Sequence, residues 1–161
     1  MSFSTMKIGT RFAFGLGALI ALMLVAGILV FAQVSRIAAD WHHYSDIVRH
    51  KQTAVTEGEI ALGNGIHWFK NYVLRGGNYR EKFEAEMAEL DTHVSAYRAA
   101  GGISAEENQL LEKIAQGAIA YREAMATLVA LRAGGESSPE NLDRAVKGAD
   151  RPIAEALGHL L

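Results

Sequence analysis

The chain opens with an uninterrupted apolar segment. Between Arg11 and Arg36 no residue carries a charge, and the stretch from Phe12 to Val34 is almost wholly apolar. A helix of this length would measure roughly 34 Å at 1.5 Å per residue, which matches a hydrocarbon core of about 30 Å crossed with a slight tilt. We therefore expect residues 12–34 to form a transmembrane helix.

The charges that flank this segment predict its orientation. Lys7 and Arg11 precede it and no acidic residue does, so residues 1–11 are expected to stay cytoplasmic and residues 35–161 to emerge on the opposite side. A cleaved signal peptide is the main alternative, with a weak cleavage site near Ala32. Its apolar region would span only about 7 to 15 residues, which favours the permanent anchor.

Downstream of the apolar segment, hydrophobic residues recur at three- and four-residue spacing or its sum, which predicts one face of a long amphipathic helix. This stripe comprises Ile37, Trp41, Tyr44, Val48, Val55, Leu62, Ile66, Phe69 and Val73. No turn signal separates it from the apolar segment, so a single helix is expected to continue to about Arg75. The sequence RGGN at Arg75–Asn78 predicts its end, because glycine accepts the left-handed C-cap conformation.

Two further helices are predicted by the same spacing. The first covers Tyr79–Ala99 and turns Tyr79, Phe83, Leu90, Val94 and Tyr97 inward. Ser104 followed by Glu107 forms a capping box, in which each side chain satisfies a free backbone N–H of the other residue, so another helix is expected to begin there. Its inward residues are Leu111, Ile114, Ala118, Tyr121, Met125 and Leu128, and it is expected to end at Gly134 and Gly135.

A fourth helix is expected to begin with Ser138 as its N-cap and Pro139 at its first position, where the missing N–H is harmless. Its inward residues are Leu142, Val146, Ile153, Leu157 and Leu160. Pro152 lies inside this helix and is expected to kink it or to force a local adjustment. No alternating pattern typical of a strand competes with the helical spacing anywhere in the chain.

These segments predict an all-α protein in which one transmembrane helix continues into an antiparallel up-down four-helix bundle over residues 35–161. The first helix would extend roughly 60 Å beyond Val34, whereas the fourth covers about 34 Å from Pro139. The bundle is therefore expected to be incomplete at its C-terminal end, roughly 17 residues short of the bilayer. A complete bundle would run on into a second membrane helix.

Composition excludes several functions. The formal net charge of −2 argues against a nucleic-acid-binding protein, and the absence of cysteine excludes disulfides, thiolate chemistry and covalent CxxCH haem attachment. The chain has no glycine-rich phosphate loop, nucleophile elbow or HExxH pattern, so we do not expect an enzyme. No cofactor is predicted, and a haem held between helices by two histidines is the alternative.

Two segments resemble the sensory half of bacterial methyl-accepting chemotaxis proteins of the four-helix-bundle type. They are MKIGTRFAFGLGALIALMLVAGILV at Met6–Val30, which looks like the first membrane helix, and IHWFKNYVLRGG at Ile66–Gly77, which looks like the end of the first bundle helix. The resemblance implies a chemoreceptor fragment in the bacterial inner membrane, with a periplasmic sensor domain that forms a homodimer. Similar modules also precede membrane histidine kinases and diguanylate cyclases.

The resemblance also implies a ligand site near the membrane-distal part of the bundle, often at the dimer interface, with basic residues of the first helix holding carboxylates. Here His67, Lys70 and Arg75 lie at that height, and the first two share a helix face. Arginine grips a carboxylate bidentately and lysine offers a point charge, so a small organic anion is the predicted ligand. The alternative is that these are solvated residues around a helix end, where positive charge is favourable.

A histidine-rich stretch precedes the bundle. His43, Asp46 and His50 share one helix face, with His42 adjacent, and two imidazoles with a carboxylate suit zinc or nickel. The two outer histidines would lie about 10 Å apart along the helix axis, too far for one ion without a partner helix. No metal site is therefore predicted.

Charged residues elsewhere are expected to point into solvent. Lys51 falls within the apolar stripe, where it either sets the register of packing or extends its ammonium outward, and the outward position is the commoner outcome. Arg80 with Glu84 and Lys82 with Glu86 are spaced to pair along a solvent-facing side of the second helix.

Overall fold

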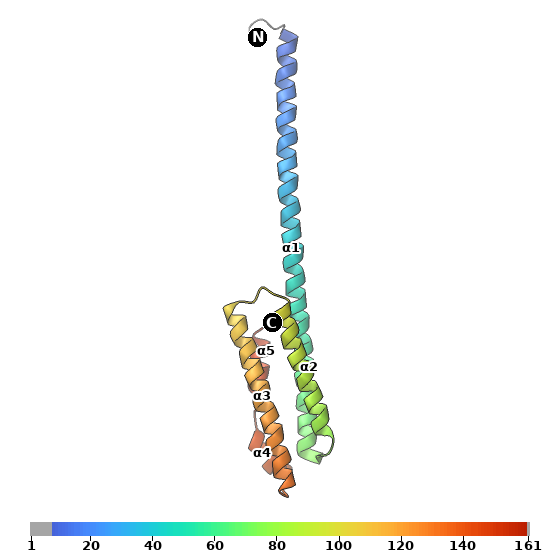
Figure 1. The fold of residues 1–161 in the computed structure, drawn as a ribbon, viewed down its shortest axis with the longest axis vertical. Helices are drawn as coiled ribbons and strands as arrows, with labels where there is room; N and C mark the ends of the chain where they lie inside the picture. Colours follow the sequence, from blue (N-terminus) through green and yellow to red (C-terminus); the bar gives the residue numbers. More distant parts are fainter. Residues whose placement is uncertain (1–7, 161) are drawn as a thin grey trace. The chain divides into compact units, whose positions relative to one another are not determined.

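The computed structural model describes residues 8–160, which form five α-helices joined by short connections (Figure 1). The helices are α1 (Ile8–Arg75), α2 (Tyr79–Ala99), α3 (Ala105–Ala133), α4 (Pro139–Val146) and α5 (Arg151–Gly158). No strand occurs among these residues, which confirms the all-α class for this part of the chain. Most of the predicted cytoplasmic N-terminus, residues 1–7, lies outside the described residues.

The chain divides into two compact units, Met1–Ser45 and Asp46–Leu161. In the first unit, every large apolar side chain from Phe12 to Val34 is at least 51% exposed. Helix α1 contains an 18-residue window with a mean hydropathy of 2.7, and by length and composition it could cross a membrane. None of that window is buried, so the segment is not the core of a domain built from the described residues.

The connection between α1 and α2 falls where the sequence predicts it. Helix α1 ends at Arg75 and α2 begins at Tyr79. The Gly76 N–H donates to the Tyr72 carbonyl at 2.9 Å, and Gly76 and Gly77 have φ angles of 65° and 76°. These angles lie in the left-handed region that side chains with a Cβ rarely enter, so the two glycines end the helix.

The predicted start of α3 is also confirmed. The Ser104 side chain accepts a hydrogen bond from the Glu107 backbone N–H at 3.0 Å, and the Glu107 carboxylate accepts one from the Ser104 backbone N–H at 2.6 Å. This reciprocal arrangement satisfies two backbone donors that the first turn of a helix leaves free. Helix α3 ends at Ala133, next to the predicted stop at Gly134.

The expectation of one continuous fourth helix is wrong. Helix α4 ends at Val146, and α5 begins only at Arg151. A proline ring inside a helix clashes with the carbonyl four residues earlier, which for Pro152 is the carbonyl of Gly148. The chain breaks at that point, since Gly148 has a φ angle of 81°, and Pro152 instead occupies the second position of α5, where its missing N–H is tolerated.

The core of the second unit draws on all five helices. The stripe predicted for α3 is buried along its whole length, from Leu111 to Leu128. On α1 the predicted stripe is buried from Val55 onward, except that Ile66 is partly buried. Its earlier members are exposed by 67%, 68%, 62% and 43% for Ile37, Trp41, Tyr44 and Val48, respectively.

Three aromatic residues from three helices meet in this core. Ring centroids lie 5.6 Å apart for Phe69 and Phe83, 4.6 Å for Phe69 and Tyr121, and 5.0 Å for Phe83 and Tyr121. Burial raises the pKa of Tyr121 above its ordinary range, with a smaller effect from the charge of Asp150. The cluster therefore joins α1, α2 and α3 through large apolar surfaces in tilted and edge-to-face geometry.

Helix α3 contacts three other helices, α2, α4 and α5. Figure 1 shows α2 beside the last part of α1, and α5 beside α3 within the second unit. Gly117 lies close to α5, since an added Cβ would lie 2.7 Å from Ile153 Cγ1.

Two glycine substitutions should therefore change stability in opposite directions. Gly117→Ala places a methyl group against Ile153 and should destabilise the unit by about 1–3 kcal/mol through overpacking. Gly63→Ala adds a methyl that meets nothing within 4 Å on an exposed part of α1, and should stabilise it by up to about 1 kcal/mol. Thermal unfolding of the two variants in mild detergent measures both, and a Gly117→Ala variant as stable as the parent would contradict the close approach.

Candidate functional site

The predicted anion-binding residues His67, Lys70 and Arg75 all have exposed side chains near the C-terminal end of α1. His67 Nε2 lies 2.9 Å from the Asn71 side-chain nitrogen, and its ring makes an edge contact with Trp68 at a centroid distance of 4.7 Å. This hydrogen bond, donated by the Asn71 amide, leaves His67 anchored within its own helix.

Arg75 and Lys70 have different surroundings. Arg75, the last residue of α1, donates from Nη1 to the Tyr79 hydroxyl at 3.4 Å. Lys70 lines an open hollow of about 310 Å³ together with Val73, Leu74, Pro139, Glu140 and Asp143. Each of the three basic residues thus has different neighbours in the structure. The anion site remains a prediction.

The hollow beside Lys70 combines both signs of charge. Glu140 and Asp143 reach its rim from α4, whereas Lys70, Val73 and Leu74 come from α1. Two carboxylates lower the positive potential around a single ammonium. An anion held by Lys70 would therefore be favoured on the side of the ammonium that faces away from α4.

The histidine-rich stretch does not assemble metal ligands within the described residues. The His50 ring donates from Nδ1 to the backbone carbonyl of Asp46 at 2.7 Å when that nitrogen carries the proton. Over residues 8–160, no three histidine, aspartate or glutamate side chains come together in an arrangement that could hold a metal ion.

A polar cluster around Lys51 has no counterpart in the sequence-based predictions. Lys51 Nζ donates to Glu107 Oε1 at 2.8 Å and to the Gly102 carbonyl at 2.7 Å, and it lies 5.1 Å from the centroid of the Tyr97 ring. The Tyr97 hydroxyl donates to the same Glu107 oxygen at 2.6 Å. The Lys51 side chain is only 13% exposed, so the expectation that it extends outward is wrong.

The hydrogen bonds and charges of this cluster shift the pKa values of Glu107 and Tyr97. The hydrogen bond from Lys51, together with those from Ser104 and Tyr97, lowers the pKa of Glu107 from 4.5 to about 2. Burial, and then the hydrogen bond and charge of Glu107, raise the pKa of Tyr97 above its ordinary range. The cluster therefore holds a carboxylate, an ammonium and a neutral phenol, and it ties α1 to the connection between α2 and α3.

The local sequence marks Lys51 as a charge inside an apolar stripe, but it does not identify the partner of Lys51, because Glu107 is 56 residues away. A charge inside an apolar stripe must either reach solvent or find a buried partner. The sequence predicts only the capping role of Glu107. In the structure its Oε2 accepts from the Ser104 backbone N–H and its Oε1 accepts from Lys51 Nζ.

A second polar contact set lies between α1 and α2. The Trp68 and Tyr79 rings stack at 18° with centroids 6.0 Å apart, and Lys82 Nζ lies 4.5 Å from the centroid of Trp68. Trp68 Nε1 donates to Glu86 at 3.4 Å, and Glu84 lies 3.6 Å from Arg122 Nε on α3. The acidic residues expected to pair along α2 thus make contacts between helices.

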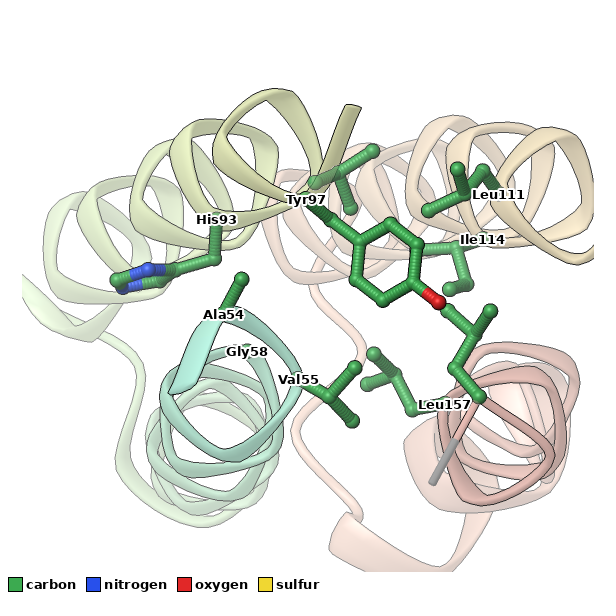
Figure 2. Close-up of a pocket in the computed structure, with 10 residues that line it drawn as sticks. Ala54, Val55, Gly58, His93, Tyr97, Leu111, Ile114 and Leu157 are labelled. Atoms are coloured by element: carbon green, nitrogen blue, oxygen red, sulfur yellow. The ribbon is translucent and has the colours of Figure 1, made fainter. Parts of the chain in front are cut away.

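The core leaves little room for a ligand. Figure 2 shows a crevice in which the Tyr97 ring lies among aliphatic side chains from several helices. Its lining residues are Ala54, Val55, Gly58, His93, Val94, Tyr97, Leu111, Ile114, Leu157 and Leu160. Its volume of about 10 Å³ is close to the minimum for a single water molecule, so this crevice is too small for an organic ligand.

Comparisons with protein-family models, curated proteins and solved structures find no significant match for this chain.

The pH dependence of stability tests the Lys51 cluster. Because the pKa of Glu107 is about 2 in the folded protein and 4.5 ordinarily, ionised Glu107 adds stability above about pH 4.5 that is lost as the pH falls toward 2. Glu107→Gln should melt at a lower temperature than the parent near neutral pH, and its melting temperature should fall less steeply below pH 5. Circular dichroism of the full chain in mild detergent measures both.

Two further variants sharpen this test. Glu106→Gln changes an exposed neighbour and should keep the pH profile of the parent. Lys51→Met retains the aliphatic stem but removes the charged donor, and should cost about 2 kcal/mol near neutral pH. If Glu107→Gln and the parent lost stability equally on acidification, the ion pair would contribute nothing to folding.

Proposed function

We propose that this chain is a membrane-anchored sensory module of the chemotaxis-receptor type. Helix α1 carries the proposal, because one continuous helix first exposes a long apolar surface and then contributes to the core of a separate compact unit. In this proposal residues 12–34 cross the bacterial inner membrane once, residues 1–11 remain cytoplasmic and residues 35–161 face the periplasm.

The sensory unit is proposed to be an antiparallel four-helix bundle. The end of α1, then α2 and α3, supply three of its helices, and α4 with α5 together take the place of the fourth. The contacts of α3 with α2, α4 and α5 support this arrangement. A bundle of this kind transmits a signal by small shifts of one helix against its neighbours, for which α1 provides the continuous element.

The proposed ligand is a small organic anion bound between two copies of the chain. Ile60, His67 and Leu74 recur every seven residues on α1, and Ile60 and Leu74 are 54% and 59% exposed, as a seam for a second helix would require. Pairing along this seam would bring the Lys70 ammonium of each copy toward the other. An anion between them relieves that repulsion, so ligand binding and pairing would favour each other.

Single-cysteine labelling tests the topology, and the chain is suited to it because it contains no cysteine. In spheroplasts a membrane-impermeant maleimide should label Ser137→Cys directly, since Ser137 is exposed, and Ser2→Cys only after lysis. Labelling of both variants only after lysis would refute the proposed orientation. Recovery of a soluble protein lacking the apolar segment would instead identify that segment as a cleaved leader.

A thermal-shift screen with succinate and citrate tests the proposed ligand class. A binding acid should raise the melting temperature of the full chain in detergent, and Lys70→Ala and Arg75→Ala should reduce the shift. Asp143→Asn should enlarge it, because it removes a negative charge from the rim of the hollow beside Lys70. Equal stabilisation of the parent and both alanine variants would exclude the proposed anion site.

A further inference from the structure

An exposed aromatic pair follows the apolar segment on α1. Trp41 and Tyr44 are 68% and 62% exposed, and their ring centroids lie 6.4 Å apart at an interplanar angle of 38°. Both belong to the first unit, Met1–Ser45, and therefore not to the compact unit that holds the core. Together with the apolar segment before them, the two rings extend a continuous exposed apolar surface, and such surfaces mark contacts with a partner or a membrane.

Its position along α1 limits what that partner is. Trp41 follows Val34 by seven residues, which places its Cα about 10 Å farther along the helix axis. Side chains of a helix lean toward its N-terminus, so the indole reaches back several ångströms toward the apolar segment. The polar layer of a bilayer extends roughly 5–8 Å beyond the hydrocarbon on each side. The indole therefore falls within that layer if the apolar segment occupies the hydrocarbon.

The chemistry of these residues fits the same layer. An indole is largely apolar with one N–H donor, a combination that concentrates tryptophan where hydrocarbon meets water. Arg36 lies two residues beyond Val34, at the depth where its guanidinium would meet lipid phosphates and bind them bidentately. Trp41 and Arg36 thus offer complementary contacts to a phospholipid headgroup.

We propose that Trp41, backed by Tyr44, inserts into the phospholipid headgroup layer and, with Arg36, fixes the depth at which α1 leaves the membrane. This inference rests on the proposed membrane anchor and adds a lipid contact outside the spanning segment. The spacing of Val34, Ile37, Trp41 and Tyr44 would also suit a two-stranded coiled coil. Lipid is favoured because such seams are usually filled by valine, isoleucine or leucine, and two successive large aromatics would crowd one.

Tryptophan fluorescence tests the contact, since the chain has two tryptophans, Trp41 and Trp68. Trp68→Phe leaves Trp41 as the sole reporter and keeps an aromatic ring on Tyr79, and Trp41→Phe is the matched control. Each full-length variant is placed in vesicles of phosphatidylcholine with phosphatidylglycerol. Lipids brominated near the headgroup end of the acyl chain should remove most of the Trp41 emission, lipids brominated at the chain terminus should remove less, and aqueous iodide should remove little. Trp68 emission should be unaffected by either lipid.

Three outcomes would overturn the inference, and they are distinguishable. If the protein floats with the vesicles but iodide quenches Trp41 freely, the anchor stands and the lipid contact is wrong. If Trp41 is protected from iodide but insensitive to both brominated lipids, another helix covers it. If the protein does not float with the vesicles at all, the membrane anchor itself fails.

Discussion

The side chains of one helix, α1, change along its length from apolar on every face to apolar on one face only. The rest of the structure depends on this change. In its first part α1 exposes apolar side chains all round, whereas from Val55 onward it buries one stripe and presents polar residues elsewhere. A helix that is apolar all round cannot be stable in water without a cover, and an amphipathic one needs a core to pack against. The sequence changes from one pattern to the other without interrupting the backbone hydrogen bonds of the helix.

Lys51 lies at the start of the buried stripe. A cation in that position would be costly if it were left unpaired, and Glu107, the Gly102 carbonyl and the Tyr97 ring together compensate for its burial. The same carboxylate caps α3, so the register of α1 and the start of α3 depend on one residue. The cost of leaving Lys51 or Glu107 without its partner would disfavour a helix that slid by one turn.

The helices were largely predictable because their signals are local. The glycines at Gly76 and Gly77 and the capping box at Ser104 act over a few residues, and both boundaries were predicted correctly. The sequence predicts one helix adjusted at Pro152, whereas the structure breaks it before Pro152, because the proline ring clashes with the carbonyl four residues earlier. The Lys51–Glu107 pair could not be predicted, because two residues 56 positions apart are joined only by the packing of the whole unit. The spacing of His67, Lys70 and Arg75 does not predict which neighbours each side chain contacts, because those neighbours are set by packing.

The division of the last helix has its own consequence. Helices α4 and α5 contain eight residues each, which is below the length at which a helix holds together by itself in water. These two helices are therefore stabilised by the burial of side chains such as Leu142 and Ile153, both of which are fully buried. Such a segment opens locally at a lower free energy than the longer helices, so its amide protons would exchange with solvent first. The helical structure of the C-terminal part of the unit therefore depends on its packing against α3.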